Sequence, residues 1–345
     1  MNIIPIAFAF DNNLTFPASI CLSSLLMHAK SDTYYDIFIL HSEKEALRTE
    51  KLNKLPSFYS NCRITYRMVD GTFDQAFEIR GITTAAYYRL LIPELFPEYD
   101  KIIYSDVDVS FRDDLSEIYQ TDMEDYYIAG VDSIAHLIPD LKNYYEKERK
   151  CDARGQIYSG NLIINSKKIL KDNLIALFKE HIGEKYKFQD MDILNIVCKG
   201  KIKYLPPSFC LTTYINDFAV NNLETLNDNW SEVEVRYALE KGIVHYNGQK
   251  PWKGFCVNFD IWWEFYRKSP YFNPKIYFDF FYGKLNELDQ LPLMKRIKIL
   301  VRYFVYGRYK GYEVGENSRW ATKAMTKSCK SILKRKVASC NENNL

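Results

Sequence analysis

The chain has 345 residues, of which 47% are hydrophobic and 26% are charged, and its formal net charge is +2 at pH 7. This composition is typical of a globular protein with a large core and excludes a disordered or fibrous chain. No run of about 20 apolar residues is present, so we expect no membrane-spanning helix. The apolar run at residues 3–10 is too short for a targeting signal, and the eight cysteines lack any Cys-x-x-Cys spacing. We therefore expect a cytoplasmic protein with reduced thiols.

Apolar runs and helix-start signals alternate along the first half of the chain. Pro17 fits the opening turn of one predicted helix. Ser42 and Glu45 form a capping-box pattern at the start of the next. The alternation predicts a doubly wound α/β sheet whose ligands bind at the carboxyl ends of strands. No Gly-x-Gly-x-x-Gly follows the first strand, which argues against a dinucleotide cofactor. The expected strands are residues 3–10, 35–40, 63–69 and 101–105, and the expected helices are residues 14–29, 43–55 and 84–95.

The run at residues 101–105 ends in Asp106-Val107-Asp108. Side chains two apart on an extended strand point to the same side, so Asp106 and Asp108 are expected to converge. Two convergent carboxylates repel unless a cation lies between them, and a hard cation completes its shell with substrate phosphates. The pattern predicts a site for a metal ion and a diphosphate. The alternative is a pair of solvated turn residues.

A second polar segment, Gly242 to Trp252, follows far downstream. Ile243 and Val244 predict a short strand that carries His245 at its end. Gly248 permits close approach of a ligand, and Lys250 provides a positive charge suited to a phosphate. A lone histidine is more often a structural hydrogen-bonding residue than a ligand, and this alternative remains open.

Together the two segments resemble the retaining glycosyltransferases of family 8, which include bacterial lipopolysaccharide galactosyl- and glucosyltransferases and glycogenin. The family pattern is Asp-x-Asp followed by a late His-x-x-Gly-x-x-Lys-Pro-Trp. Here only Gln249 separates Gly248 from Lys250, where the bacterial galactosyltransferases have two residues. The resemblance covers roughly residues 1–265 and implies a GT-A fold, a Rossmann-like mixed sheet flanked by helices.

The resemblance also implies roles for individual residues. Arg89 is expected near the diphosphate and donor sugar, and Asp132 and Asp190 are expected to hold the donor sugar. Asn13 also fits a cap for the first helix, and Arg89 also fits a surface position. Asp192, two residues after Asp190, fits an acid in the first turn of a helix. The metal ligands are expected to be Asp106, Asp108 and His245. The nucleotide-sugar contacts are expected from Ala9, Asp11, Asn13, Arg89, Asp106, Val107, Asp132, Asp190, Met191, Gly248 and Lys250.

Two positions depart from the family pattern. The sugar-contacting Asn of the Phe-Asn-Ser/Ala-Gly-Val segment is replaced by Tyr158. The second Gln of Gln-Asp-Gln-Asp, on the β-face of the donor sugar in relatives, is replaced by Met191. A thioether cannot act as a carboxamide nucleophile or hydrogen-bond donor. Either the reaction does not need that residue, or this chain handles its sugar differently.

The predicted reaction moves galactose or glucose from a UDP-hexose donor to a glycan or lipid-linked acceptor. Mn²⁺ is favoured over Mg²⁺ because imidazole suits a transition ion. The expected catalytic residues are Arg89, Asp190 and Lys250. Two alternatives stay open: a nucleotide-sugar-binding protein that has lost catalysis, and a phosphohydrolase of the haloacid dehalogenase type. The late position of Asp106 in the chain disfavours the phosphohydrolase.

The charges are unevenly distributed along the chain. Residues 295–336 hold thirteen Lys and Arg against two Glu, interleaved with aliphatic and aromatic residues. This pattern fits a segment that binds an anionic membrane surface at the inner face of the cell membrane. A solvated helical tail is the alternative, and no nucleic-acid motif accompanies the charge. We expect a catalytic domain at residues 1–270, a helical basic region at 271–336 and a disordered tail at 337–345.

Overall fold

A computed structural model describes residues 2–42, 44, 46–73, 76–78 and 83–306. Its main element is a seven-stranded mixed sheet in the order β3-β2-β1-β4-β7-β6-β8. The strands β1 to β4 pair in parallel, whereas β7 is antiparallel to both β4 and β6. These strands are β1 (Asn2–Ala9), β2 (Thr33–Ser42), β3 (Cys62–Val69), β4 (Ile102–Ser105), β6 (Ile128–Gly130), β7 (Asn161–Ile164) and β8 (Ile202–Tyr204).

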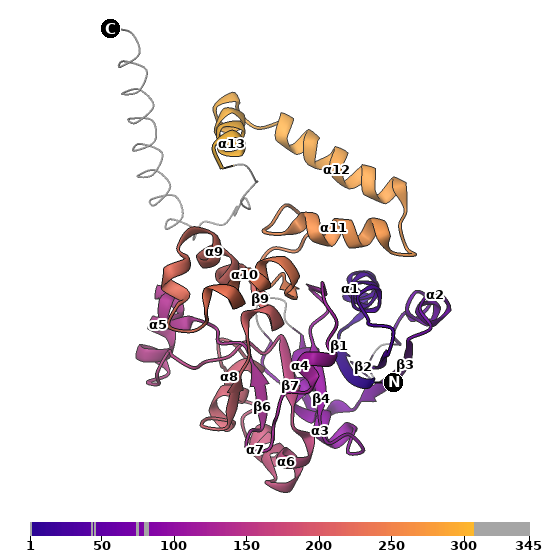
Figure 1. Cartoon of the computed structure of the whole chain (residues 1–345), viewed down its shortest axis with the longest axis vertical. Coiled ribbons are helices and arrows are strands. Elements are labelled where there is room, and N and C mark those ends of the chain that lie inside the picture. The colour runs from indigo at the N-terminus through magenta and orange to yellow at the C-terminus, as the bar shows by residue number, and fades with distance from the viewer. Residues whose placement is uncertain (1, 43, 45, 74–75, 79–82, 307–345) are drawn as a thin grey trace.

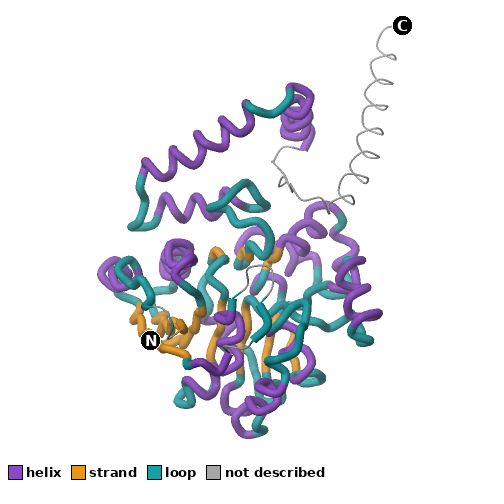
Figure 2. The backbone as a smooth tube through the Cα atoms, turned by 180° about the vertical axis from the view of Figure 1, so that it is seen from behind, coloured by secondary structure: helices purple, strands orange, loops and turns teal. Residues whose placement is uncertain are grey.

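Helices cover both faces of this sheet (Figures 1 and 2). Side chains along β1 alternate between two hydrophobic clusters, one on each face: Ile4, Ile6 and Phe8 lie in the first, and Ala7 and Ala9 in the second. Burial of both faces explains why this strand is almost continuously apolar. The helices of this body are α1 (Thr15–Met27), α2 (Leu55–Phe58), α3 (Ile92–Leu95), α4 (Ser116–Tyr119), α5 (Pro139–Asn143), α6 (Ser166–Lys171), α7 (Leu174–Glu180), α8 (Asp190–Val197), α9 (Thr213–Asn221), α10 (Glu232–Lys241) and α11 (Phe259–Lys268).

A small second sheet has the order β5-β10-β9. Its strands are β5 (Val109–Ser110), β10 (Val244–His245) and β9 (Leu211–Thr212). β10 pairs antiparallel with β5 and parallel with β9. Because β5 begins just after β4 ends, this sheet lies at the carboxyl end of β4 and extends the main sheet towards the site.

Two predicted helices are wrong in part. Residues 46–51 contain no helix, and a 3₁₀ turn at Leu52–Lys54 leads into the short helix α2. The Asn12 side chain donates to the Ala46 carbonyl at 3.0 Å and accepts from the Arg48 amide at 2.8 Å. These two backbone groups are therefore not available for the hydrogen bonds of a helix. Glu45, the second member of the predicted capping box, lies outside the described residues.

The second partly wrong helix is the one predicted at residues 84–95. It is a 3₁₀ helix over Thr84–Leu91, followed by α3. In addition, Asn13 does not cap α1. The Asp11 side chain accepts from the Asn13 amide at 2.9 Å and caps the 3₁₀ turn Asn12–Leu14 that precedes the helix.

Two further helices follow α11: α12 (Pro274–Asp289) and α13 (Leu293–Tyr306). Figure 1 shows α12 beside α11, above the main body. The two helices pack through aromatic rings, with Trp263 and Phe280 centroids 4.5 Å apart. The proposed boundary at residue 270 falls in the turn between α11 and α12 and stays a prediction. Of the basic region, only the part up to Tyr306 is described, and the predicted tail at 337–345 lies outside the described residues.

Candidate active site

The two carboxylates of the Asp-x-Asp segment lie where the chain passes from the main sheet to the small one. Asp106 follows β4, and its amide donates to the Gly160 carbonyl at 2.7 Å. Asp108 directly precedes β5, and residues 106–108 form a bend rather than an extended strand. Both side chains still converge, because the bend turns them towards the same histidine.

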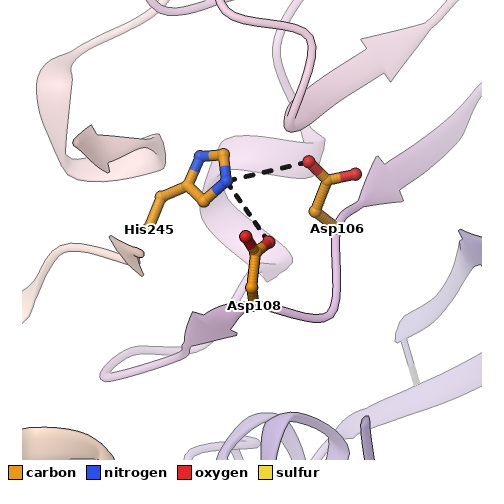
Figure 3. Close-up of side chains that lie close together, drawn as sticks. All are labelled: Asp106, Asp108 and His245. Atoms are coloured by element: carbon orange, nitrogen blue, oxygen red, sulfur yellow. Dashed lines mark ion pairs between the residues drawn. The ribbon is translucent and has the colours of Figure 1, made fainter. Parts of the chain in front are cut away.

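His245 lies on β10, opposite Val109 of β5. The Tyr246 amide donates to the Asp108 carbonyl at 2.9 Å, which fixes the distance between the two segments. The Nε2 atom of His245 is 3.3 Å from Asp108 Oδ1 and 3.7 Å from Asp106 Oδ2 (Figure 3). One ligand atom from each of the three residues lies within 4.8 Å of the others.

Each carboxylate has one oxygen held by other groups and one oxygen that faces His245. Asp106 Oδ1 accepts from Arg89 Nη2 at 2.9 Å and from the Tyr104 hydroxyl at 2.8 Å. Asp108 Oδ2 accepts from the Lys250 ammonium, which also donates to the Tyr246 carbonyl at 2.6 Å. The remaining oxygens and Nε2 form an O,O,N donor set, which fits a divalent transition ion.

Neighbouring charges shift the pKa values of Asp108 and His245. Burial raises the pKa of Asp108, but Lys250 and His245 outweigh it and hold that pKa well below its usual range. Burial lowers the pKa of His245, but Asp108 and Cys210 raise it to about 10. The Asp108 carboxylate therefore pairs with the His245 imidazole, 3.3 Å away.

Arg89 links the Asp-x-Asp segment to a third carboxylate. Its Nε lies 3.2 Å from Asp190 Oδ2, and its Nη1 donates to the Ser159 carbonyl. The guanidinium also stacks 4.2 Å from the Tyr104 ring centroid. Arg89 is 4% exposed, so the surface alternative is wrong and the arginine is buried and paired.

The two acids predicted to hold the donor sugar are buried. Burial raises the pKa of Asp190 to about 6, although the Arg89 guanidinium lowers it. Burial likewise raises the pKa of Asp132 to about 6, although its Oδ1 accepts from the Ile134 amide at 2.6 Å. Burying a carboxylate away from water costs free energy unless a polar partner or ligand interacts with its charge. Both groups are therefore candidates for binding polar substrate atoms.

The remaining predicted contact residues lie around the strand ends. Ala9 ends β1, which runs parallel to β4, so Ala9, Asp11 and Asn13 follow the strand next to the one that carries Asp106. The Val107 side chain is buried in the first hydrophobic cluster, so only its backbone faces a ligand. Gly248 is exposed, and no protein atom lies within 4 Å of a Cβ built on it.

Both departures from the family pattern are packed against the core. Tyr158 is buried, and Met191 is half-buried against the first cluster. Burial raises the pKa of the Tyr158 hydroxyl, although the Thr212 side chain lowers it. Among the described residues, no hydrogen bond of normal geometry reaches this hydroxyl.

The acid Asp192 has a structural role. It accepts from the Tyr144 hydroxyl at 2.6 Å and from the Phe188 amide at 2.9 Å, close to the start of α8. The alternative of a first-turn helix acid therefore holds.

Sequence reasoning missed three residues at the site: Tyr104, Gly160 and Cys210. Tyr104 lies in β4, two residues before Asp106, and this spacing along the strand is the sequence signal that places it beside the site. A Cβ on Gly160 would lie 2.3 Å from His245 Cε1 and 2.9 Å from Asp106 Oδ2, so glycine is required there for space. Cys210 Sγ lies 3.5 Å from His245 Nδ1, and nothing in its sequence neighbourhood indicates this contact.

The mixed sheet, with carboxylates at the end of a central strand, is the arrangement of the GT-A fold. The sequence model described as Glycosyl transferase family 8 matches residues 5–256, and the chain belongs to this family. Its expected fold class is thereby confirmed. No helix within the described residues is long and apolar enough to cross a membrane.

Among curated relatives, the chain is 28% identical over 284 residues to a lipopolysaccharide 1,2-glucosyltransferase of Escherichia coli, covering 78% of this chain and 79% of that protein. It is 33% identical over 170 residues to a putative glycosyltransferase of Haemophilus influenzae, covering 47% of this chain and 49% of the relative. Among solved structures, the galactosyltransferase LgtC, in complex with donor and acceptor sugar analogs, superposes with a TM-score of 0.64 at 22% identity. That match covers 79% of this chain and 98% of LgtC.

Proposed function

We propose that this protein is a retaining hexosyltransferase that moves galactose or glucose from a UDP-sugar to a glycan or lipid-linked acceptor. The observation that carries the proposal is the convergence of Asp106 Oδ2, Asp108 Oδ1 and His245 Nε2 at the end of β4. Relatives named for 1,2-glucosyl transfer to lipopolysaccharide and for galactosyl transfer support the donor and acceptor classes.

In this proposal, separate residues bind the donor and assist the departure of UDP. Asp106, Asp108 and His245 would hold a divalent ion, Mn²⁺ in preference to Mg²⁺, and the ion would supply positive charge to the UDP diphosphate. Lys250 adds a second positive charge beside it. Asp190, held by Arg89, accepts hydrogen bonds from donor-sugar hydroxyls. Asp132, which follows β6 at the same edge of the sheet as Asp106, does the same.

The proposed reaction needs no protein nucleophile. The acceptor hydroxyl oxygen bonds to the anomeric carbon on the face from which UDP departs, as the carbon–oxygen bond to the diphosphate breaks. The leaving phosphate oxygen takes the acceptor proton, so configuration is retained. A methionine at position 191 is compatible with this path, because a thioether is not required to attack. Double displacement would need a protein nucleophile, and the candidate next to position 191 is Asp190, because Asp192 is bonded to Tyr144 and Phe188.

The test is a donor screen with UDP-galactose, UDP-glucose and other UDP-sugars in Mn²⁺, in Mg²⁺ and in excess EDTA. Release of UDP supports transfer, binding without turnover supports a protein that has lost catalysis, and phosphate release supports a phosphohydrolase. Asp106→Ala, Asp108→Ala and His245→Ala should each abolish UDP release while the protein stays folded. Asp100→Ala is the control, because that exposed carboxylate pairs with exposed Lys167 away from the site. Turnover that persists in EDTA would remove the metal from the proposal.

The basic region supports a second, separate proposal: attachment to the anionic inner face of the cell membrane. Within this region, α13 begins the part rich in Lys and Arg and exposes Leu293, Met294, Ile297 and Val301. Each basic residue near an anionic surface contributes roughly 1 kcal/mol, so several suffice for salt-sensitive binding. A lipid-linked acceptor would place the substrate at the same surface.

Vesicle sedimentation tests this attachment. Truncation after Met294 should release the protein from vesicles rich in anionic lipid and leave UDP-sugar hydrolysis largely unchanged. Equal, salt-insensitive sedimentation of both proteins, or of neither, would contradict membrane binding and leave the region as packed structure.

A further inference from the structure

A buried thiol lies directly behind the histidine of the candidate metal site. Cys210 is fully buried, and its Sγ is 3.5 Å from His245 Nδ1. The contact is fixed by the small sheet, because β9 begins one residue after Cys210 and pairs Thr212 with His245 of β10. Within the described part of the chain, this is the contact that satisfies Nδ1.

The imidazole ring is held on three of its edges. Nε2 faces Asp106 and Asp108, Nδ1 faces Cys210, and Cε1 lies in the space left by the missing side chain of Gly160. A ring turned by 180° about its Cβ–Cγ bond would lose both the carboxylate and the thiol contacts. The arrangement therefore selects a single ring orientation.

We propose that Cys210 is a positioning residue for the metal centre, an inference that rests on the proposed metal-dependent function. A histidine that binds an ion through Nε2 must carry its proton on Nδ1. That N–H then needs an acceptor, and the Cys210 sulfur is the atom placed to receive it. When an ion binds Nε2, the sulfur in this position favours the tautomer with the proton on Nδ1, which leaves the Nε2 lone pair for the ion between it and the two carboxylates.

The competing interpretation is that Cys210 only fills space, since it also belongs to the first hydrophobic cluster. Cys198 provides a matched control. It is equally buried, lies in the second cluster at the end of α8, and has no side-chain hydrogen bond to another described residue. A residue that only fills space should behave alike at both positions.

The experiment measures Mn²⁺ binding directly, from the electron paramagnetic resonance signal of the free ion at fixed pH. Variants are Cys210→Ala, Cys210→Ser and Cys198→Ala, and thermal unfolding of each is recorded. Loss of an outer-shell partner typically costs 10–100-fold in metal affinity, so Cys210→Ala should bind Mn²⁺ at least about tenfold more weakly. Cys210→Ser, which keeps an acceptor, should recover part of the loss, and Cys198→Ala should bind as the wild type.

Pulsed resonance gives a second readout: the nitrogen hyperfine coupling of bound Mn²⁺ should weaken in Cys210→Ala. Wild-type affinity in Cys210→Ala, or an equal loss in Cys198→Ala, would overturn the role of Cys210. If Cys210→Ala does not fold, Cys210→Val, which fills the space without an acceptor, replaces it. If the wild type binds no Mn²⁺, or Asp108→Ala binds it equally well, the metal site itself is refuted and the inference falls with it.

Discussion

Arg89 Nη2 donates to Asp106 Oδ1 at 2.9 Å, so a buried arginine holds the first acid of the Asp-x-Asp segment. The same guanidinium lies 3.2 Å from Asp190, which comes from the start of α8 on the other side of the site. One side chain therefore joins the carboxylate proposed for metal binding to the one proposed for sugar binding. It also leaves the second oxygen of Asp106 free to face His245.

Replacing this arginine should separate the two carboxylates. Lysine carries the charge but lacks the planar fork, so Arg89→Lys cannot bond Asp106 and the Ser159 carbonyl while it also pairs with Asp190. We expect kcat/KM for sugar transfer to fall at least about a hundredfold. Arg63→Lys, at an arginine that pairs with Asp36 outside the site, should leave transfer unchanged. Near-wild-type kinetics of Arg89→Lys would contradict the joining role.

Met191 and Asp190 are neighbours with opposite expected sensitivity. Met191 packs half-buried against the first cluster, so Met191→Ala should reduce transfer about tenfold or less, equivalent to about 1.4 kcal/mol. Asp190→Asn should cost far more, because it removes the charge that pairs with Arg89. Steady-state kinetics of the two variants measure the difference between these losses. Similar large losses would show that Met191 shapes the donor site, and a trapped sugar ester on Asp190 would establish double displacement.

Gly160 is expected to be intolerant of any side chain. Its Cβ would lie 2.3 Å from His245 Cε1, so Gly160→Ala must displace the histidine or the β7 backbone. We expect Mn²⁺ affinity to fall at least about tenfold, measured by titration of the free ion. Gly183→Ala is the control, since no atom lies within 4 Å of a Cβ there. Unchanged affinity in Gly160→Ala would show that His245 is not held against β7.

Asp132 should make stability depend on pH. Burial raises its folded pKa to about 6 from 3.8, so the folded protein binds this proton more tightly than the unfolded chain does. The ionised carboxylate therefore lowers the free energy of unfolding above about pH 6, and this cost fades as the pH falls towards 4. Asp132→Asn should stabilise the protein at about pH 7.5 by roughly 1–2 kcal/mol more than at about pH 4.5.

Urea unfolding at both pH values measures this difference. Exposed Asp100→Asn should change stability little at either pH. A gain for Asp132→Asn that does not depend on pH would assign the effect to hydrogen bonding with Ile134 instead of to charge.

Local sequence signals identified the elements that depend on burial alone. The strands at β1, β2, β3 and β4 follow from apolar runs, because a strand covered by helices on both faces must be apolar along its length. The same signals misplaced the helix at residues 43–55, because the competing bonds from Asn12 come from more than thirty residues away. No local pattern contains that information.

The sequence by itself determined the kinds of chemical group at the site and the order in which they occur, because Asp106, Asp108, His245 and Lys250 lie in two recognisable segments. Only the tertiary structure decided how they meet. Three features bring them together: the bend between β4 and β5, the pairing of β10 with both β5 and β9, and the space at Gly160. As a result, one oxygen of each aspartate bonds a cationic side chain and the other faces His245. These contacts join residues from 17 to 142 positions apart, and their distances depend on sheet register and packing, which spacing along the chain does not specify.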